Sequence, residues 1–345
     1  MLTLTPMIKK SFQFSTAKVQ YYFGAEFSYL KKMLNPEQTV FIADENFAMA
    51  NKSRFAGWKT IVIPSGEQQK VMLMIDKLIT RLISVGAGKQ TTLVGIGGGV
   101  VTDITGYLAS VFMRGVDFGF VPTSVLAMTD AAIGGKNGVN VGLYKNMAGL
   151  IRQPKFILYD YTLLKTLPKE EWVNGFAEII KHACIYDAAM FKLLEGQKLP
   201  FFQKNMEGLA KLIERNVLLK TKAVLKDELE TGDRKLLNFG HTIGHAIENL
   251  YRIPHGQAVG IGMGVACKIS EQLTGFTETG RVLKLLKQYG HTPHLQFDNE
   301  KVWKLVLADK KSSGKDIDYI VLDKIGKASI VHLPLEQLHN MINEL

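Results

Sequence analysis

The stretch TLVGIGGGVVTD, Thr92–Asp103, decides how the first half of the chain is interpreted. Its apolar start runs into three consecutive glycines, Gly97–Gly99, and a helical pattern begins at Val100. Glycines at such a turn let backbone N–H groups approach a phosphate, and the helix N-terminus adds positive potential. The spacing departs from G-x-G-x-x-G, because Val100 occupies the third glycine position. A tight structural turn is therefore the rival interpretation.

Outward from this stretch, buried-strand and helical patterns alternate. Further strands are predicted at Val40–Ala43, Thr60–Pro64, Phe118–Val121 and Phe156–Tyr159, and helices at Val71–Val85 and Val100–Phe112. This alternation predicts a parallel sheet covered by helices. The segment Phe12–Phe23 alternates more like an edge hairpin.

After Pro168 long helical periodicities dominate. They lie at Glu170–Cys184, Met206–Leu225, Leu236–Leu250, Gln257–Leu273 and Glu278–Tyr289, with a late strand pair at Tyr319–Leu322 and Ser329–Leu333. We therefore expect an α/β, Rossmann-like nucleotide-binding domain over residues 1–168 and an all-α C-terminal domain over residues 169–345. Small-molecule sites usually lie in clefts between domains, so we expect one there.

Composition excludes several classes of protein. The 345 residues carry a net charge of +10, with 46% hydrophobic and 21% charged residues. No run reaches the roughly 18–20 apolar residues of a membrane span, and the start shows no secretory pattern. Lys and Arg are scattered among Asp and Glu, which favours a solvated surface or a small anionic substrate over nucleic acid. Two cysteines are too few for a disulfide framework, and a cytoplasmic protein is expected.

Two further polar segments follow predicted strands. Asp44 begins an acidic strand end, where a ribose hydroxyl is often held, although an exposed turn is the alternative. The segment Ser65–Lys70 ends in a lysine suited to a phosphate. Asp103 either pairs with a cofactor or favours the first turn of its helix.

The histidines and one glutamate suggest a metal. His241 and His245 share one helix face and can bind zinc together, but Thr242 replaces the Glu of the zincin motif. His255 stands alone before a helix, as a cap or surface residue would. Glu178 lies in an apolar helical stretch, where a carboxylate must be paired or bind a metal, and an intrahelical ion pair with Lys181 is the plain alternative.

Cationic residues recur near glycines. Examples are Arg114, the segment Asp130–Asn140, the pair Lys145-Asn146 and the segment Asp227–Arg234. Each can be a loop with incidental charge, but together they suit recognition of phosphate and carboxylate groups.

In order and spacing these motifs resemble the 3-dehydroquinate synthases, from about residue 39 to about residue 330. The series is S-G-E-Q-x-K at Ser65–Lys70, G-G-G-V-V-x-D at Gly97–Asp103, M-R-G at Met113–Gly115, V-P-T at Val121–Thr123, G-G-K at Gly134–Lys136, K-N at Lys145–Asn146, L-K-T-L-P at Leu164–Pro168, A-E-I-I-K at Ala177–Lys181, D-E-x-E-x-G-x-R at Asp227–Arg234, L-N-x-G-H-T-x-G-H at Leu237–His245, H-G at His255–Gly256 and D-K-K at Asp309–Lys311.

The resemblance implies a metal- and substrate-binding role for the second domain. It implies that Glu178, His241 and His255 bind the metal, normally zinc with cobalt as an alternative. It replaces the pairing of His241 with His245, and gives His245 a role at the substrate phosphate or in proton transfer.

It also implies NAD as cofactor. The implied NAD-binding residues are Asp44, Ser65, Gly66, Glu67, Gln68, Gln69, Lys70, Gly99, Val100, Val101, Thr102, Asp103, Thr123, Ser124, Lys136, Lys145, Leu163, Leu164, Lys165 and Thr166.

The implied reaction converts 3-deoxy-arabino-heptulosonate 7-phosphate to 3-dehydroquinate and phosphate, in the shikimate pathway to aromatic amino acids. The implied catalytic and substrate-binding residues are Asp130, Lys136, Asn146, Lys181, Lys220, Glu230, Arg234, Asn238, His245 and one lysine of the Lys310-Lys311 pair. Arg114 is implied to reach the neighbouring subunit's site, which implies a homodimer.

Three departures bear on the substrate. Ala132 and Asn137 stand where many relatives have serine and threonine, and Ser124 replaces a second threonine. A sister sugar-phosphate cyclase is therefore one rival, although Arg234 with Lys220 suits a substrate carboxylate. Further rivals are a metal-dependent alcohol dehydrogenase of the glycerol dehydrogenase type and a nucleotide-binding regulatory protein.

Overall fold

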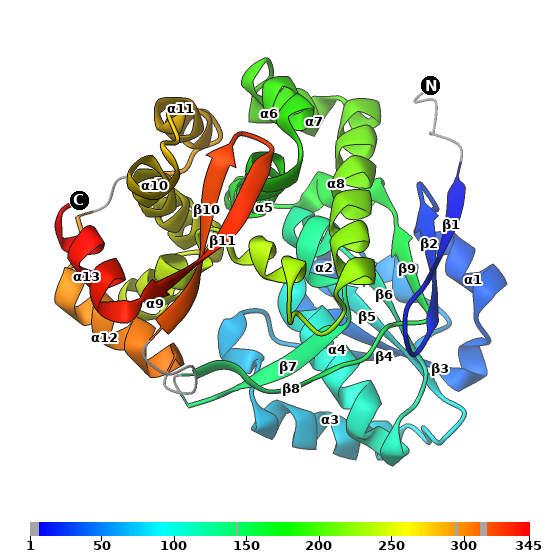
Figure 1. Ribbon diagram of the computed structural model, residues 1–345. Coiled ribbons are helices and arrows are strands. Elements are labelled where there is room, and N and C mark those ends of the chain that lie inside the picture. The colour runs from blue at the N-terminus through cyan, green and yellow to red at the C-terminus, as the bar shows by residue number, and fades with distance from the viewer. Residues whose placement is uncertain (1–6, 143, 294–295, 311–315) are drawn as a thin grey trace. The chain divides into compact units, whose positions relative to one another are not determined.

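The computed structural model describes residues 7–142, 144–293, 296–310 and 316–345. The chain forms two compact units (Figure 1). The first contains the residues up to Pro168 and the segment Asn205–Leu229, and the second contains Lys169–Lys204 and Glu230–Leu345. Each unit is described by itself.

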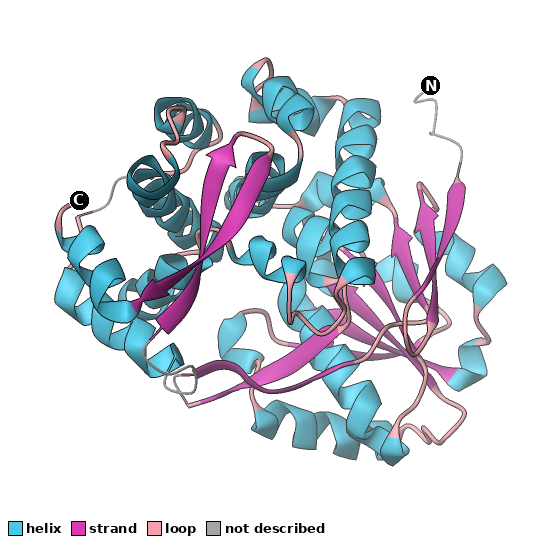
Figure 2. Ribbon diagram, in the orientation of Figure 1, coloured by secondary structure: helices cyan, strands magenta, loops and turns pink. Residues whose placement is uncertain are grey.

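The first unit contains a seven-stranded sheet, drawn as magenta arrows in Figure 2. Its strand order is β1 (Ile8–Gln13), β2 (Lys18–Phe23), β9 (Phe156–Tyr159), β6 (Phe118–Pro122), β5 (Thr92–Gly97), β3 (Thr39–Asp44) and β4 (Lys59–Ile63). The strand β1 pairs antiparallel with β2, and every other pair is parallel. The five strands and the edge hairpin predicted from the sequence are confirmed.

The central strands are buried because both faces of the sheet are covered. Residues of β3, β5 and β6, such as Phe41, Val94 and Val121, have at most 2% of their surface exposed. Such continuous apolar strands are typical of parallel sheets. The helices of this unit are α1 (Leu30–Met33), α2 (Glu45–Ala50), α3 (Met72–Ser84), α4 (Gly99–Val111) and α8 (Met206–Lys226).

The helix α8 belongs to the first unit, which differs from the expected division into residues 1–168 and 169–345. It is held there by the ion pairs of Glu214 with Lys10 and of Lys220 with Asp130, and by Thr221 beside the hydroxyl of Tyr21. Helical periodicity shows that α8 is amphipathic, but it does not show which unit receives its apolar face.

A two-stranded ribbon, β7 (Lys136–Val141) and β8 (Tyr144–Ile151), completes the first unit. Sequence reasoning interpreted part of it as a charged loop, because the ribbon is rich in polar residues and glycine. Gly138 pairs with Gly149, and a Cβ on Gly138 would lie 2.9 Å from the carbonyl oxygen of Ala148. The ribbon is therefore formed largely by backbone pairing, with Val139 as its buried apolar side chain.

The second unit is helical, as predicted, with one hairpin. Its helices are α5 (Lys169–Tyr186), α6 (Ala188–Glu195), α7 (Leu199–Lys204), α9 (His241–Tyr251), α10 (His255–Thr274), α11 (Thr279–Gln288), α12 (Asn299–Lys310) and α13 (Leu335–Asn343), and its strands are β10 (Asp316–Lys324) and β11 (Lys327–Pro334). The hairpin is the exception to an all-α unit, and it lies where the late strand pair was predicted.

The helix predicted over Leu236–Leu250 is interrupted. A 3-10 turn, η8 (Asp233–Asn238), is followed by Gly240 with a φ of 79°, and α9 begins only at His241. A Cβ on Gly262 of α10 would lie 1.9 Å from the carbonyl oxygen of Gly240. The two glycines thus let α9 begin directly against α10. Within the described residues, the helices are all too short or too polar to cross a membrane.

Candidate metal centre and nucleotide-binding edge

Glu178 is a fully buried carboxylate on α5. The apolar residues around it drive this helix into the interior of the second unit, so the carboxylate loses its water and needs partners. Lys181, three residues on and also buried, forms an ion pair with Oε2. The intrahelical pair that the sequence offered as the plain alternative is therefore present.

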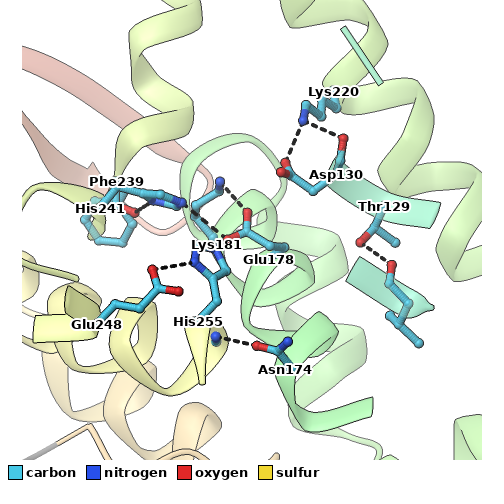
Figure 3. Close-up of polar contacts among 12 residues, drawn as sticks. Thr129, Asp130, Asn174, Glu178, Lys181, Lys220, Phe239, His241, Glu248 and His255 are labelled. Atoms are coloured by element: carbon cyan, nitrogen blue, oxygen red, sulfur yellow. Dashed lines mark hydrogen bonds and ion pairs between the residues drawn. The ribbon is translucent and has the colours of Figure 1, made fainter. Parts of the chain in front are cut away.

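Two histidines from other helices face the second oxygen of Glu178 (Figure 3). Nε2 of His241 lies 3.5 Å from Oε1, and Nε2 of His255 lies 3.4 Å from the same atom. His241 is the first residue of α9 and His255 is the first residue of α10. One ligand atom from each of the three residues lies within 4.8 Å of the other two.

The Nδ1 atoms of both histidines face acceptors outside the cluster. Nδ1 of His241 lies 3.2 Å from the carbonyl oxygen of Phe239, and Nδ1 of His255 lies 3.2 Å from Oε2 of Glu248. In the tautomer in which Nδ1 donates to these acceptors, Nε2 keeps its lone pair. This arrangement is typical of metal-binding histidines, whose outer nitrogen donates to a carboxylate or carbonyl group.

The spacing of the cluster fits a zinc ion. Zinc–ligand bonds of about 2.1 Å in tetrahedral geometry place neighbouring ligand atoms about 3.4 Å apart. The observed separations from Oε1 are 3.4 and 3.5 Å, which is long for a hydrogen bond. Among the described residues, neither oxygen of Glu178 has a hydrogen-bond donor in good geometry. Three protein ligands would leave a coordination position open, as catalytic zinc requires.

The pKa directions of Glu178 and His241 agree with this ligand set, whereas that of His255 favours its protonated form in the absence of a metal. Burial would raise the pKa of Glu178, but the Lys181 ammonium and the two imidazoles hold it well below its usual range. Burial, followed by the Lys181 charge, lowers the pKa of His241. Burial opposes the charged form of His255, yet the carboxylates of Glu178 and Glu248 raise its pKa to about 9. An ionised carboxylate and a neutral His241 are the forms that bind metal.

His245 lies one turn beyond His241 on α9, with ring centroids 5.0 Å apart. A second possible ligand group consists of His245, Glu248 and His255. It shares His255 with the Glu178 group. The Glu178 group is the better candidate because its carboxylate is fully buried, and His245 lies beside it.

Three other predicted residues of the second unit lie in η8 or just before it: Glu230, Arg234 and Asn238. Arg234 is buried, and Nδ2 of Asn238 donates to Oε1 of Glu230 at 2.7 Å. The neighbouring Lys235 pairs with Asp318 of β10 at 2.7 Å, which holds η8 to the hairpin. Of the predicted lysine pair, Lys310 is the last residue of α12, and Lys311 lies outside the described residues.

In the first unit, the predicted cofactor residues follow the carboxyl ends of parallel strands. Asp44 ends β3, and the segments Ser65–Lys70, Gly99–Asp103, Thr123-Ser124 and Leu163–Thr166 follow β4, β5, β6 and β9. The sheet order reverses between β3 and β5, since β4 lies beyond β3 and β6 lies beyond β5. Such a reversal is where open α/β sheets bind ligands.

The turn at this reversal begins α4 without a side-chain cap. The helix α4 has Gly98 as its N-cap and no side chain capping its first turn. A Cβ on Gly97 would lie 2.5 Å from Cγ2 of Val101, so only glycine allows the helix to start this close to the strand. A tight structural turn, the rival interpretation, explains why Gly97 must be glycine. The backbone N–H groups in the first turn of α4, which no side chain caps, suit an anion.

Asp44 already has two partners. Its Oδ1 caps α2 by accepting from the N–H of Phe47 at 3.0 Å, and its Oδ2 accepts from the hydroxyl of Ser65 at 2.7 Å. The carboxylate thus links the ends of β3 and β4. Each oxygen has a second lone pair for a ligand hydroxyl.

Lys70 is buried and joins three segments. Its ammonium contacts Asp103 of α4 and Oδ1 of Asn146 on β8. Burial raises the pKa of Asp103, and the charge of Lys70 opposes that rise. The ammonium of Lys70 therefore contacts protein groups in this structure, whereas the sequence analysis expected it to contact a phosphate.

Sequence reasoning names Asn140 only as the end of the segment Asp130–Asn140 and gives it no role of its own. Its Nδ2 donates to Oε1 of Glu67 at 2.8 Å, its Oδ1 accepts from the N–H of Asn146 at 2.9 Å, and its own N–H donates to the carbonyl of Lys70 at 2.7 Å. It ties the Ser65–Lys70 segment to the ribbon. An asparagine in a strand carries no sequence signal for this role.

Asp130 lies on a π-helical turn, Ala127–Ala131, and is paired with Lys220. The ammonium of Lys220 donates to the carbonyl of Asp130 at 2.7 Å and to its Oδ1 at 2.8 Å. Single π-helical turns are frequent at functional sites. Of the remaining predicted residues, Leu163 and Leu164 are buried, Lys145 is half-buried, and Arg114, Lys136 and Lys165 are exposed.

Two of the three departures from the family pattern, Ala132 and Asn137, are packed into the interior of the first unit. Ala132 is buried. Nδ2 of Asn137 donates to the carbonyl oxygens of Gly135 at 2.6 Å and Arg152 at 2.9 Å. A Cβ on Gly106 would lie 1.8 Å from Oδ1 of Asn137. Asn137 thus packs against α4 and supports the ribbon.

The fold and the buried cluster define the class: an α/β unit of nucleotide-binding type with a helical unit that carries a candidate metal centre. Family models agree, because the 3-dehydroquinate synthase N-terminal model matches residues 60–174 and the C-terminal model matches residues 175–312. A 3-dehydroquinate synthase from Pyrococcus abyssi is 40% identical over 287 residues, covering 83% of this chain and 85% of that protein. The chain belongs to the 3-dehydroquinate synthase family.

Solved structures show the same fold. A 2-deoxy-scyllo-inosose synthase complexed with carbaglucose-6-phosphate, NAD+ and Co2+ matches with a TM-score of 0.85 and 22% identity, covering 98% of this chain and 100% of that chain. A 2-epi-5-epi-valiolone synthase from Streptomyces hygroscopicus, with NAD+ and Zn2+ bound, matches with a TM-score of 0.86 and 24% identity, covering 97% and 98%.

Proposed function

We propose that the protein catalyses the 3-dehydroquinate synthase reaction, the conversion of 3-deoxy-arabino-heptulosonate 7-phosphate to 3-dehydroquinate and phosphate. Family membership supports this activity, which belongs to the shikimate pathway and is that of a carbon–oxygen lyase acting on phosphates. The observation that carries the proposal is the buried group of Glu178, His241 and His255 beside Lys181.

Zinc is the proposed metal, with cobalt as an alternative, and both ions occur in the structural neighbours named above. Glu178, His241 and His255 would hold it through Oε1 and the two Nε2 atoms. When bound, the metal would polarise a substrate hydroxyl and lower its pKa. Glu248 and the carbonyl of Phe239 keep the imidazole rings oriented for this role.

NAD is the proposed cofactor, held at the carboxyl edge of the sheet in the first unit. The N–H groups at the start of α4 would meet its pyrophosphate, and Asp44 with Ser65 would accept or donate to ribose hydroxyls. When bound, NAD would supply reversible hydride transfer, so no net NADH is expected to accumulate.

The substrate is an anionic sugar-acid phosphate, and a set of charged and polar residues is proposed to bind it. In the second unit these are Lys181, Arg234, Asn238 and His245, and in the first unit Asp130, Lys136, Asn146 and Lys220. Lys181 is held by Glu178, and Lys220 by Asp130, so each ammonium has a fixed position before substrate arrives. Fixed charges stabilise a developing anion at little reorganisation cost.

The chain is further proposed to act as a cytoplasmic homodimer. Arg114 supports the dimer because it is exposed and therefore accessible to a second copy of the chain. Sedimentation measures the oligomeric state of wild type and Arg114→Ala, and phosphate release measures their activity. A dimer is expected in both, with activity lost in the variant.

The substrate assignment is tested by a comparison of three phosphates. Metal-loaded protein with NAD is incubated with 3-deoxy-arabino-heptulosonate 7-phosphate, sedoheptulose 7-phosphate or glucose 6-phosphate, and released phosphate is measured. Phosphate release from the first compound alone, matched by dehydroquinate, is expected. Release from only one of the others would contradict the assignment and favour a sister cyclase. NADH accumulation with glycerol would favour a dehydrogenase.

A further inference from the structure

Asn174 connects the two helices that carry Glu178 and His255. It lies on α5 four residues before Glu178, and its Oδ1 accepts a hydrogen bond from the backbone N–H of Gly256 on α10 (Figure 3). Gly256 directly follows His255. One hydrogen bond thus connects Gly256, which follows the candidate ligand His255, to Asn174, which lies one helical turn before the candidate ligand Glu178.

The N–H of Gly256 needs an acceptor from outside its own helix. His255 is the first residue of α10 and Gly256 the second, and N–H groups in a first helical turn have no intrahelical partner. An N-cap side chain usually accepts from this position. The N-cap here is Pro254, which makes no side-chain cap. Asn174 therefore supplies from α5 the acceptor that α10 lacks.

Gly256 also sets how closely the two helices approach. A Cβ on Gly256 would lie 2.4 Å from the carbonyl oxygen of Asn174 and 2.7 Å from its Cα. Real Cβ atoms do not come this close to backbone atoms, so any other residue would move α10 away from α5. His255 would move with it, because it is the preceding residue.

The asparagine is itself oriented on α5. Its Nδ2 lies 3.3 Å from Oε2 of Glu171, one turn earlier, which directs Oδ1 toward Gly256. Both contacts lie on the second unit alone. Neither the motif series nor the ligand set includes Asn174.

We propose that Asn174 and Gly256 form a clamp that positions Nε2 of His255 relative to Oε1 of Glu178, and so sets metal affinity and coordination geometry. Asn174 is a positioning residue, since it contacts the helix backbone and neither ligand side chain. The inference rests on the proposed metal-dependent function. Outer contacts of this kind typically change metal affinity by about 10- to 100-fold.

The test compares zinc affinity and the absorption spectrum of the cobalt-substituted protein in four variants. Asn174→Ala removes the acceptor, Asn174→Asp keeps it, and Gly256→Ala adds the obstructing Cβ. The matched control is Gln257→Ala. Gln257 also bonds near the start of α10, to Gly290 at 2.9 Å and Thr292 at 3.1 Å, and neither of these two bonds involves α5.

Zinc affinity is measured by competition with a chromophoric chelator. Asn174→Ala and Gly256→Ala are expected to bind zinc about 10- to 100-fold more weakly and to change the cobalt spectrum. Gln257→Ala is expected to keep the wild-type affinity and spectrum. Asn174→Asp keeps the acceptor for Gly256 but loses the donor to Glu171, so its affinity should lie between those of wild type and Asn174→Ala. Thermal unfolding of metal-free protein shows whether each variant folds, and Asn174→Ser, whose hydroxyl is too short to reach Gly256, replaces Asn174→Ala if that variant does not.

Wild-type affinity and an unchanged cobalt spectrum in Asn174→Ala would overturn the clamp while leaving the metal centre intact. A wild-type protein that binds neither zinc nor cobalt would overturn the metal centre, and the clamp with it. The two failures are distinguished by the wild-type titration alone.

Discussion

Nε2 of His255 lies 3.4 Å from Oε1 of Glu178, although Glu178 lies within α5 and His255 is the first residue of α10. This separation matches two ligands of one tetrahedral zinc ion, and it is longer than a good hydrogen bond. The pair is also the point at which α5 and α10 are joined through Asn174 and Gly256. The candidate metal centre therefore depends on how these two helices pack.

Replacement of Glu178 by glutamine should abolish tight metal binding. The amide keeps the shape but not the charge, and it leaves Lys181 buried without its anion. Breaking a buried ion pair costs about 3–5 kcal/mol, so the free energy of unfolding should fall by that order as well. Equilibrium dialysis and urea unfolding measure the two effects. Glu170→Gln, an exposed change on the same helix, is the control. Stoichiometric zinc in the Glu178 variant would contradict the ligand assignment.

A second prediction concerns Gly97 and Gly98, which are adjacent but differ in the space around them. A Cβ on Gly97 would lie 2.5 Å from Val101, whereas one on Gly98 would meet only Ser124 at an ordinary 3.5 Å. Gly97→Ala should lower the free energy of unfolding by about 1–3 kcal/mol, and Gly98→Ala should not.

Measuring NAD affinity distinguishes a structural role of this turn from a role in binding the pyrophosphate. If the backbone of Gly98 meets the pyrophosphate, Gly98→Ala weakens NAD binding while leaving stability unchanged. Calorimetric titration with NAD measures this. Equal NAD affinity in wild type and Gly98→Ala would argue that the turn is structural only.

Asn140 should matter for NAD binding without touching the sheet edge itself. Asn140→Ala loses the hydrogen bonds with Glu67 and Asn146, each worth about 0.5–1.5 kcal/mol. We expect NAD affinity to fall by roughly tenfold. Asn140→Asp keeps the acceptor for Asn146 and loses the donor to Glu67, so it should show an intermediate affinity. Unchanged affinity in both variants would show that the ribbon does not support the Ser65–Lys70 segment.

His291 should make the protein less stable in acid. It is 3% exposed, and burial lowers its pKa to about 4. In the unfolded chain its pKa is about 6.5, so between pH 6.5 and 4 the unfolded state binds more protons and stability falls as the pH falls. The full loss is about 3 kcal/mol. Urea unfolding of wild type and His291→Leu across this range measures it, and parallel pH profiles for the two proteins would contradict the prediction.

Local patterns predicted most of the first unit. The strands β3, β5, β6 and β9 are short apolar runs separated by helical periodicity, and such runs have few alternatives in a parallel sheet. The ribbon of β7 and β8 was missed because its polar and glycine residues pair through the backbone. The helix α8 was assigned to the wrong unit because its partners, such as Asp130, lie far away in sequence.

The candidate metal centre was harder to predict. From spacing alone, His241 was paired with His245, and His255 looked like a cap or surface residue. Only the resemblance to a family grouped His241 and His255 with Glu178. The structure brings these three together through contacts that no local pattern encodes, such as the close approach of Gly240 and Gly262 between α9 and α10. Asn174 carries no sequence signal, and Asn140 is marked only as the end of the polar segment Asp130–Asn140.

The most direct test of the proposed activity is a balance of products in metal-depleted protein before and after zinc is added. With NAD and 3-deoxy-arabino-heptulosonate 7-phosphate, the metal-depleted protein should release no phosphate. Added zinc should restore equal amounts of phosphate and dehydroquinate, with no net NADH. Undiminished turnover in the metal-depleted protein would contradict the account, as would NADH that accumulates in step with phosphate.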